Sequence, residues 1–439
     1  FFFFFFLVDK SNEHLEKENQ VSLSAGELVG QIYDELLDQY KNPDNEHSQK
    51  SINQLCVRIV FCLYAEDAGI FGKKNMFHDY LEEFDARHMR KALINLFKVL
   101  DTKVKDRDPY LEDDEPKLAQ FPYVNGGMFS DENIEIPPFT DELRDLLLSK
   151  ASDEFDWSEI SPTIFGAVFE STLNPDTRRQ GGMHYTSIEN IHKVIDPLFL
   201  DELKDELNEL KKVKQPAKLK KKASAFQDKL ANLTFFDPAC GSGNFLTETY
   251  LQLRRLENDA IKLIYPNPSL DVGQAQDIIK VSIQQFYGIE INDFAVSVAK
   301  TALWIAESQM LEETKDIFYA DWDFLPLKTY TNIHEGNALR MDWNEVIPSY
   351  ACHYIMGNPP FVSNTGRVSN KESHSKKMLT SEQSDERFEI FGKIGGILDY
   401  VACWYKKAAD MMKNTTIKTA FVATDSIVEG QQVGPLWEA

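Results

Sequence analysis

The chain has 439 residues, of which 43% are hydrophobic, so it can bury a sizeable core in two or three domains and is not globally disordered. No apolar run reaches membrane-spanning length, so no membrane partner is expected. The net charge of -23 argues against a surface coated with DNA-binding groups.

Five widely spaced cysteines without a CxxC pair fit a reducing cytoplasm and argue against a zinc cluster. We therefore expect no metal site. Cys240 and Cys352 are interpreted as small buried hydrophobic residues.

Residues 1–24 begin with the run FFFFFFLV, which is too short to span a bilayer and lacks the positive region of a signal peptide. We interpret this stretch as an N-terminal tail or an appended segment of non-native origin, and we assign it no function.

Residues 25–175 are predicted to form an all-helical spacer domain. Ile52, Leu55, Ile59 and Leu63 belong to one apolar helix stripe, and Gly69 supplies a stop signal. The stretch ARHMRKALINLFKVLD (86–101) repeats the helical pattern.

Two acidic features of this domain are interpreted without a catalytic role. Glu66 and Asp67 are predicted to form a polar helix end, with a contact to the following domain as the alternative. The acidic, proline-containing stretch 106–117 is predicted to be a loop. Its EPK triplet (115–117) has the spelling of a nuclease site but lacks flanking strands.

Short apolar runs alternate with amphipathic stretches in residues 176–439, which predicts an α/β domain with a doubly wound parallel sheet. The expected strands are 233–236, 286–291, 353–356 and 419–423, and 245–257 and 293–309 are expected helices. The seven lysines of residues 211–222 are interpreted as a solvated helix face or loop. Ligands of such sheets bind at the carboxyl ends of the strands.

The first expected strand runs into DPACGSGNF (237–245). Gly241 and Gly243 permit a tight turn and close approach of a ligand, while Asp237 places a carboxylate where it can receive an amino group. The GxGxxG pattern and the P-loop lysine are both absent.

The second expected strand ends in YGIEIND, with Glu290 at the position where this architecture holds the two hydroxyls of a ribose. Ile291 beside it is placed to pack against an adenine face.

The order GGMHYTS (181–187), DPACGSGNF, IEIND, GNAL (336–339) and NPPF (358–361) resembles that of γ-class S-adenosylmethionine-dependent DNA adenine-N6 methyltransferases. Together with FCLYAEDAGIF (61–71), it is most similar to the type IIL, MmeI-like restriction–modification enzymes. The resemblance covers residues 25–439 and implies a Rossmann-like catalytic domain at 176–439.

The resemblance also implies the site residues. The cofactor S-adenosylmethionine would be bound by Tyr185, Thr186, Asp237, Ala239, Gly241, Gly243, Asn244, Glu290, Ile291, Asn337 and Ala338. The catalytic residues would be Asn358, Pro359, Pro360 and Phe361. Many relatives carry aspartate where this chain has Asn337, so cofactor affinity is affected rather than activity.

The NPPF motif fits the methylation of an exocyclic amine, whose lone pair is delocalised into the ring. The side-chain carbonyl of Asn358 and the backbone carbonyl of Pro359 would accept the two N–H bonds and favour a pyramidal, nucleophilic amine. Proline pre-positions these acceptors, and Phe361 offers a stacking face. An adenine within double-stranded DNA must be flipped out to reach them.

The resemblance implies action within a restriction–modification or phage-defence system in the bacterial or archaeal cytoplasm. Two alternatives stay open, a protein glutamine-N5 methyltransferase and a non-catalytic cofactor-binding defence subunit. We expect the catalytic domain to be incomplete at its C-terminus, with the target-recognition region absent. A restriction subunit or a fused nuclease would lie outside this chain.

Overall fold

The computed structural model describes residues 10–124, 127–131, 133–166, 186–266, 278–318, 330, 332–361 and 379–438. The chain divides into two compact units. The helical unit comprises Phe1–Tyr185 and Ser297–Thr331, and the sheet unit comprises Thr186–Val296 and Asn332–Ala439. The predicted domain boundary at residue 175 lies outside the described residues.

The helical unit confirms the predicted all-helical region. Its described N-terminal elements are α1 (Lys10–Leu37), α2 (Glu46–Asp67), α3 (Met76–Leu81), α4 (Ala86–Asp101), η2 (Val104–Asp106), α5 (Leu111–Asp114), α6 (Pro116–Ala119), α7 (Asp141–Asp145), η3 (Leu146–Asp153) and η4 (Trp157–Glu159). Helix α4 has the predicted bounds, and the side chain of Asp85 caps it by accepting a hydrogen bond from the backbone N–H of His88.

The end of α2 at Asp67 confirms the predicted helix terminus. Glu66 is buried and accepts hydrogen bonds from the His78 backbone N–H (2.9 Å) and the Ser152 hydroxyl (2.7 Å). Asp67 accepts from the backbone N–H of Trp157 (2.7 Å). These acids therefore hold neighbouring segments of the helical unit together.

The predicted loop at 106–117 is wrong in part, because α5 and α6 form within it. Pro116 occupies the first turn of α6, where a missing backbone N–H leaves no hydrogen bond unmade. Acidic side chains fill the first turn of α5, where the helix dipole favours negative charge.

The sheet unit contains a five-stranded parallel sheet in the order β3-β2-β1-β4-β5, which confirms the predicted fold class. The strands are β1 (Phe235–Asp237), β2 (Phe286–Glu290), β3 (Ile333–Glu335), β4 (Tyr354–Gly357) and β5 (Lys418–Phe421). Four were predicted. Strand β3 was missed because it has three residues, of which only Ile333 is buried.

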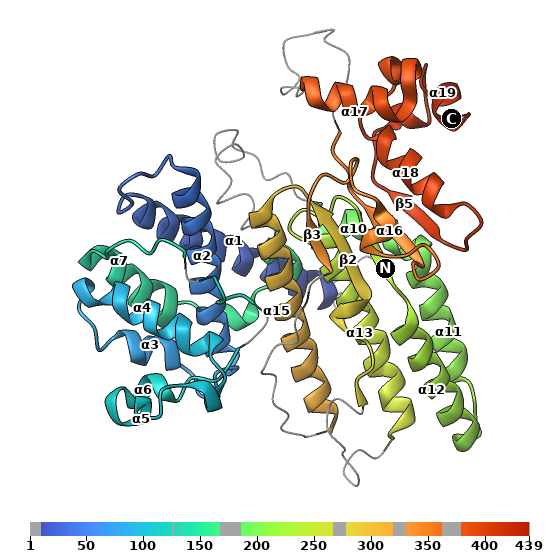
Figure 1. The fold of residues 1–439 in the computed structure, drawn as a ribbon. Coiled ribbons are helices and arrows are strands. Elements are labelled where there is room, and N and C mark those ends of the chain that lie inside the picture. The colour runs from blue at the N-terminus through green and yellow to red at the C-terminus, as the bar shows by residue number, and fades with distance from the viewer. Residues whose placement is uncertain are drawn as a thin grey trace, which may run out of the picture. The chain divides into compact units, whose positions relative to one another are not determined.

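The described helical elements around the sheet are α10 (Ile188–Ile195), η5 (Asp196–Leu200), α11 (Asp201–Lys211), α12 (Pro216–Asn232), α13 (Asn244–Ile264), η6 (Ile283–Gln285), α15 (Asp293–Phe318), α16 (Trp343–Val346), α17 (Ser381–Phe391), η7 (Gly392–Ile397), α18 (Ala402–Met412), η8 (Asp425–Ile427) and α19 (Val433–Trp437). Figure 1 shows α11, α12 and α13 side by side. Helices α13 and α15 confirm the two predicted helices. From Ser297 onward, α15 belongs to the helical unit.

Alternating side chains of the strands build two cores. On one face, Phe235 of β1 stacks between Phe286 of β2 and Tyr354 of β4, with 5.3 Å between ring centroids in each pair. On the other face, Phe236 meets Trp343 edge to face at 5.2 Å. Each fully buried aromatic ring contributes roughly 1.5–3 kcal/mol, so these rings fix β1 at the centre of the sheet.

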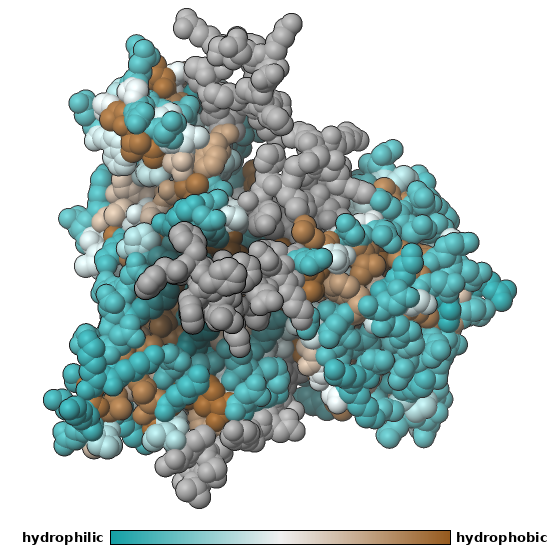
Figure 2. All heavy atoms as spheres, turned by 180° about the vertical axis from the view of Figure 1, so that it is seen from behind, coloured by the Kyte–Doolittle hydropathy of each residue, from teal (hydrophilic) through white to brown (hydrophobic). Residues whose placement is uncertain are grey.

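The surface and cysteine predictions are confirmed. All seven lysines of residues 211–222 are exposed, on the end of α11, the following turn and α12, and all five cysteines are buried. On the face shown in Figure 2, most of the described surface is hydrophilic, in agreement with the net charge. No helix in the described ranges is long and apolar enough to cross a membrane.

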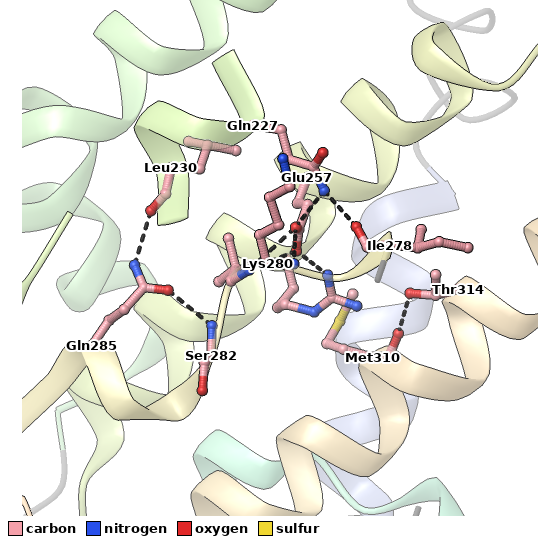
Figure 3. A network of polar contacts seen from close by, with 11 residues as sticks. Gln227, Leu230, Glu257, Ile278, Lys280, Ser282, Gln285, Met310 and Thr314 are labelled. Atoms are coloured by element: carbon pink, nitrogen blue, oxygen red, sulfur yellow. Dashed lines mark hydrogen bonds and ion pairs between the residues drawn. The ribbon is translucent and has the colours of Figure 1, made fainter. Parts of the chain in front are cut away.

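The fully buried carboxylate of Glu257 ties α13 to the chain that leads into β2. It forms an ion pair with Arg254 and accepts from the Gln227 amide (2.8 Å) of α12. It also accepts from the backbone N–H groups of Lys280 (2.6 Å) and Val281 (3.2 Å). Figure 3 shows this carboxylate between the Gln227 side chain and the Lys280 backbone.

We predict that Glu257→Ala destabilises the sheet unit by about 3–5 kcal/mol, because it breaks the buried ion pair with Arg254 and removes the acceptor for Gln227 and the Lys280 backbone. Asp259→Ala is the matched control on the same helix, since its ion pair with Lys211 is well exposed and is worth about 0–1 kcal/mol. Urea denaturation followed by circular dichroism measures both. Equal midpoints for the two variants would show that Glu257 does not organise this region.

Candidate active site

The strand order reverses beside β1, which pairs with β2 on one side and β4 on the other. Loops on either side of such a reversal diverge and leave a crevice at the carboxyl edge of the sheet. The predicted site residues follow the carboxyl ends of β1, β2, β3 and β4. The fold therefore brings four motifs, which lie within residues 237–361 of the chain, to one sheet edge.

The glycine-containing loop after β1 takes the shape that the sequence predicted. Gly241 has a φ of 52° and Gly243 a φ of 85°, in the left-handed region that favours glycine. Gly243 is the N-cap of α13, so the positive end of that helix faces the loop. The Cys240 backbone N–H donates to the Ile289 carbonyl of β2 (3.1 Å), which anchors the loop over the sheet.

Glu290 links two of the loops. Its Oε2 accepts from the backbone N–H of Gly241 (2.9 Å), and its Oε1 accepts from that of Asn292 (3.0 Å). A carboxylate oxygen can accept more than one hydrogen bond, so these contacts are compatible with the predicted binding of ribose hydroxyls. Ile291 next to it is 68% exposed, so an apolar face is open to a planar ligand.

Asp237 lies beneath the loop and is only 1% exposed. Its Oδ1 accepts from the backbone N–H of Ala239 (3.0 Å). Burial raises the pKa of Asp237 to about 8, and the nearby negative charge of Glu290 adds to the rise. The acid is therefore largely protonated at neutral pH.

Gly357, the last residue of β4, has a steric role in the site. Gly357 has a φ of 152°, and a Cβ there would lie 2.3 Å from Oδ1 of Asp237. The carboxyl group of β1 thus packs directly against the backbone of β4, which only a glycine allows. This contact sets the position of Asn358, the next residue.

Asn358 presents a buried acceptor. Its Nδ2 donates to the hydroxyl of Thr186 (2.8 Å), while its Oδ1 is buried and has no partner among the described residues. Buried polar atoms without a hydrogen bond are rare and indicate a place for a ligand or water. Pro359 is buried, whereas Pro360 and Phe361 are exposed.

The turn after β3 holds Asn337 and Ala338. Asn337 donates through Nδ2 to Oε1 of Glu386 (2.6 Å) and accepts through Oδ1 from the backbone N–H of Leu339 (2.9 Å). The buried Ala338 offers its carbonyl to the indole N–H of Trp343 (2.8 Å). Asn244, in the first turn of α13, is also buried, and Tyr185 lies outside the described residues.

Two supporting contacts have no sequence motif. His192 of α10 lies between Glu248 of α13 (3.2 Å) and Asp196 (2.8 Å), and the Glu248 hydrogen bond raises the pKa of the histidine. Trp404 of α18 donates its indole N–H to the Pro238 carbonyl (3.1 Å). The His192 contact joins α10, the helix that follows Thr186, to α13. The Trp404 contact joins the start of the glycine loop to α18.

The chain is similar to known proteins. The family model of the MmeI DNA-methyltransferase domain matches residues 211–439, and that of the MmeI helicase spacer domain matches residues 50–129. DNA methyltransferase A of Bacillus subtilis (strain 168) is 38% identical over 446 residues, with 99% of this chain and 47% of the relative covered.

A putative type II restriction enzyme and methyltransferase of Methanocaldococcus jannaschii is 26% identical over 347 residues, which cover 69% of this chain and 28% of that protein. The structure of the type IIL restriction–modification enzyme MmeI in complex with DNA superposes with a TM-score of 0.81 at 38% identity. It covers 95% of this chain and 52% of MmeI.

The chain thus spans about half the length of MmeI and of the Bacillus relative. Its methyltransferase-model match takes in more than half of its residues, and the similarity to the Bacillus protein runs over nearly all of them. The resemblance found in the sequence motifs is confirmed, and the chain belongs to the MmeI-like DNA methyltransferase family.

Proposed function

We propose that this chain transfers a methyl group from S-adenosylmethionine to the N6 amine of an adenine flipped out of double-stranded DNA. The observation that carries the proposal is the buried Oδ1 of Asn358 at the carboxyl end of β4, which has no hydrogen-bond partner among the described residues. An exocyclic amine supplies the donor that this oxygen lacks, and family membership supplies the reaction class.

The chemistry of the chain's own residues is electrostatic. The Asn358 Oδ1 and the Pro359 carbonyl would accept the two N–H bonds of the amine and free its lone pair for attack. The contact between Gly357 and Asp237 holds these acceptors in place before any substrate binds, so little reorganisation accompanies reaction. Phe361, 42% exposed, would stack against the flipped base.

The residues present also fit the proposed cofactor, which when bound supplies an electrophilic methyl group. Gly241 and Gly243 turn the loop with positive φ angles, and the α13 N-terminus would attract a carboxylate. Glu290 would accept the ribose hydroxyls and the exposed Ile291 would cover an adenine face. Asn337 and Ala338 would border the other edge of that ring.

We place this activity in a restriction–modification or phage-defence system of a bacterium or archaeon, as the names of the relatives suggest. The partner would be double-stranded DNA, with any restriction subunit or nuclease outside this chain. The proposal is tested by incubating the chain with DNA and radiolabelled S-adenosylmethionine and analysing the nucleosides. N6-methyladenine supports it. Label only in N4-methylcytosine would overturn it, as would label in glutamine of a peptide offered in a parallel reaction with none in DNA.

We predict that Asn358→Ala lowers the single-turnover rate of methyl transfer by about 100-fold or more while cofactor affinity changes little, because the oxygen faces the amine and not the cofactor. Single-turnover rates and calorimetric cofactor affinities are measured on the same preparations. Phe361→Ala should instead weaken base binding. A wild-type rate in Asn358→Ala would contradict the assigned role.

Glu290→Ala should weaken S-adenosylmethionine binding by roughly 1.5–3 kcal/mol, because it removes charged hydrogen-bond acceptors. Glu335→Ala is the matched control, since this exposed acid pairs in register with Glu290 on the next strand. Isothermal titration calorimetry should show a clearly smaller loss for the control. Equal losses in both variants would mean a general charge effect in place of ribose binding.

Cofactor affinity should rise as pH increases toward the Asp237 pKa of about 8, because the bound sulfonium and ammonium charges favour the ionised carboxylate. Binding at pH 7 should therefore release a proton, which calorimetry in buffers of different ionisation enthalpy measures. Asp237→Asn should abolish the release that depends on this group. The same release in both proteins would assign the proton to another group.

A further inference from the structure

We propose that Glu386, which lies outside every sequence motif, is a positioning residue for the turn after β3 (336–340). We also propose that its carboxylate is the reason why position 337 holds an amide. The proposal deepens the proposed function, on which it rests, because the turn is the predicted border of the adenine ring. Glu386 would act through Asn337 and not by touching the cofactor.

The carboxylate of Glu386 is the centre of a buried cluster. The residue is only 4% exposed and belongs to α17, the helix after the NPPF motif in the chain. Its Oε1 accepts from Asn337 Nδ2 (2.6 Å) and pairs with Arg340 Nε (2.8 Å). Its Oε2 accepts from the Tyr400 hydroxyl (2.5 Å). One carboxylate thus contacts the turn after β3 at two residues, Asn337 and Arg340.

The helix that carries Glu386 is itself anchored. Arg387, the neighbouring residue, is 2% exposed and donates through Nη1 to the Leu398 carbonyl (2.7 Å). Tyr400 packs in the sheet core, where burial raises its pKa and the contact with Glu386 adds to the rise. The Glu386 carboxylate is therefore held in a fixed position by its own helix and by Tyr400, and it can orient the turn after β3.

The orientation of the Asn337 amide is unambiguous. Its oxygen must face the Leu339 backbone N–H, which can only donate, so its nitrogen faces Oε1 of Glu386 and donates to it. An aspartate at position 337 could keep the first contact. It would, however, replace the amide nitrogen, which lies 2.6 Å from Oε1 of Glu386, by a second carboxylate oxygen. Two carboxylates this close repel each other, which raises the pKa of the pair.

This geometry gives a reason for an amide at position 337 in this chain. The local negative charge is supplied from α17 by Glu386, and Arg340, whose side chain is 57% exposed, is the cation that pairs with it. Asparagine is the partner that satisfies both the backbone and this carboxylate. The amide at 337 and the acid at 386 form a donor–acceptor pair, and we expect the pair to tolerate an exchange of amide and acid between the two positions.

The test is a polarity swap with three variants, Asn337→Asp, Glu386→Gln and the double variant. Asn337→Asp should weaken S-adenosylmethionine binding at least about tenfold, since a like charge shifts a carboxyl pKa by one unit or more. The double variant should recover most of the wild-type affinity, because the amide at 386 would donate to the carboxylate at 337. Tyr400→Phe is the control, since it removes a contact of Glu386 and leaves the polarity of the pair unchanged.

Thermal unfolding between pH 4 and 8 is the second readout, and it needs no cofactor. In Asn337→Asp, the shared proton raises a folded-state carboxyl pKa above its unfolded value. The stabilisation is then present at low pH and lost as pH rises through the raised value. The double variant should lack this pH-dependent loss.

The outcomes separate the two claims. If wild-type protein does not bind S-adenosylmethionine, the proposed function fails, and the pH profiles still decide the coupling. If the double variant is as impaired as the two single changes combined, in affinity and in melting temperature, the coupling between 337 and 386 is refuted. Rescue of both measurements in the double variant, with neither the affinity loss nor the pH profile of Asn337→Asp in Tyr400→Phe, would establish Glu386 as the positioning residue.

Discussion

The contact between the Asp237 carboxyl group and the backbone of Gly357 is the constraint on which the site depends. It joins β1 to β4 at the place where the strand order reverses, and it leaves no room for a side chain at position 357. The contact fixes the glycine loop after β1 relative to the NPPF segment after β4. The proposed cofactor site and the proposed amine acceptors would thereby be held at a fixed separation.

Three acidic side chains connect the loops and strands of the site. Glu290 joins the loops after β1 and β2, Asp237 joins β1 to β4, and Glu386 joins the turn after β3 to α17. Each is satisfied by protein groups in the absence of a ligand. Preorganised dipoles of this kind need no rearrangement at the moment of reaction, which is how a site without a covalent nucleophile can accelerate methyl transfer.

The positions of the site motifs at the ends of the strands could be predicted because each motif is a short local sequence. The glycines of the loop, the acid at the end of β2 and the Asn358–Phe361 motif each follow a strand that the alternation of apolar runs reveals. Sequence reasoning missed β3, which has a single buried residue, and placed a loop where Pro116 begins α6. It also missed Glu386, His192 and Trp404. Their partners are 49, 56 and 166 residues away, and no local pattern encodes such contacts.

The central claim is that the buried oxygen of Asn358 receives the target amine. The most direct measurement is a structure of the protein with a non-reactive cofactor analogue and a DNA duplex that contains an extruded adenine. The account predicts the adenine N6 within about 2.7–3.2 Å of both Asn358 Oδ1 and the Pro359 carbonyl. An adenine N6 bound elsewhere in the crevice, with Oδ1 hydrogen-bonded to protein or water, would contradict it.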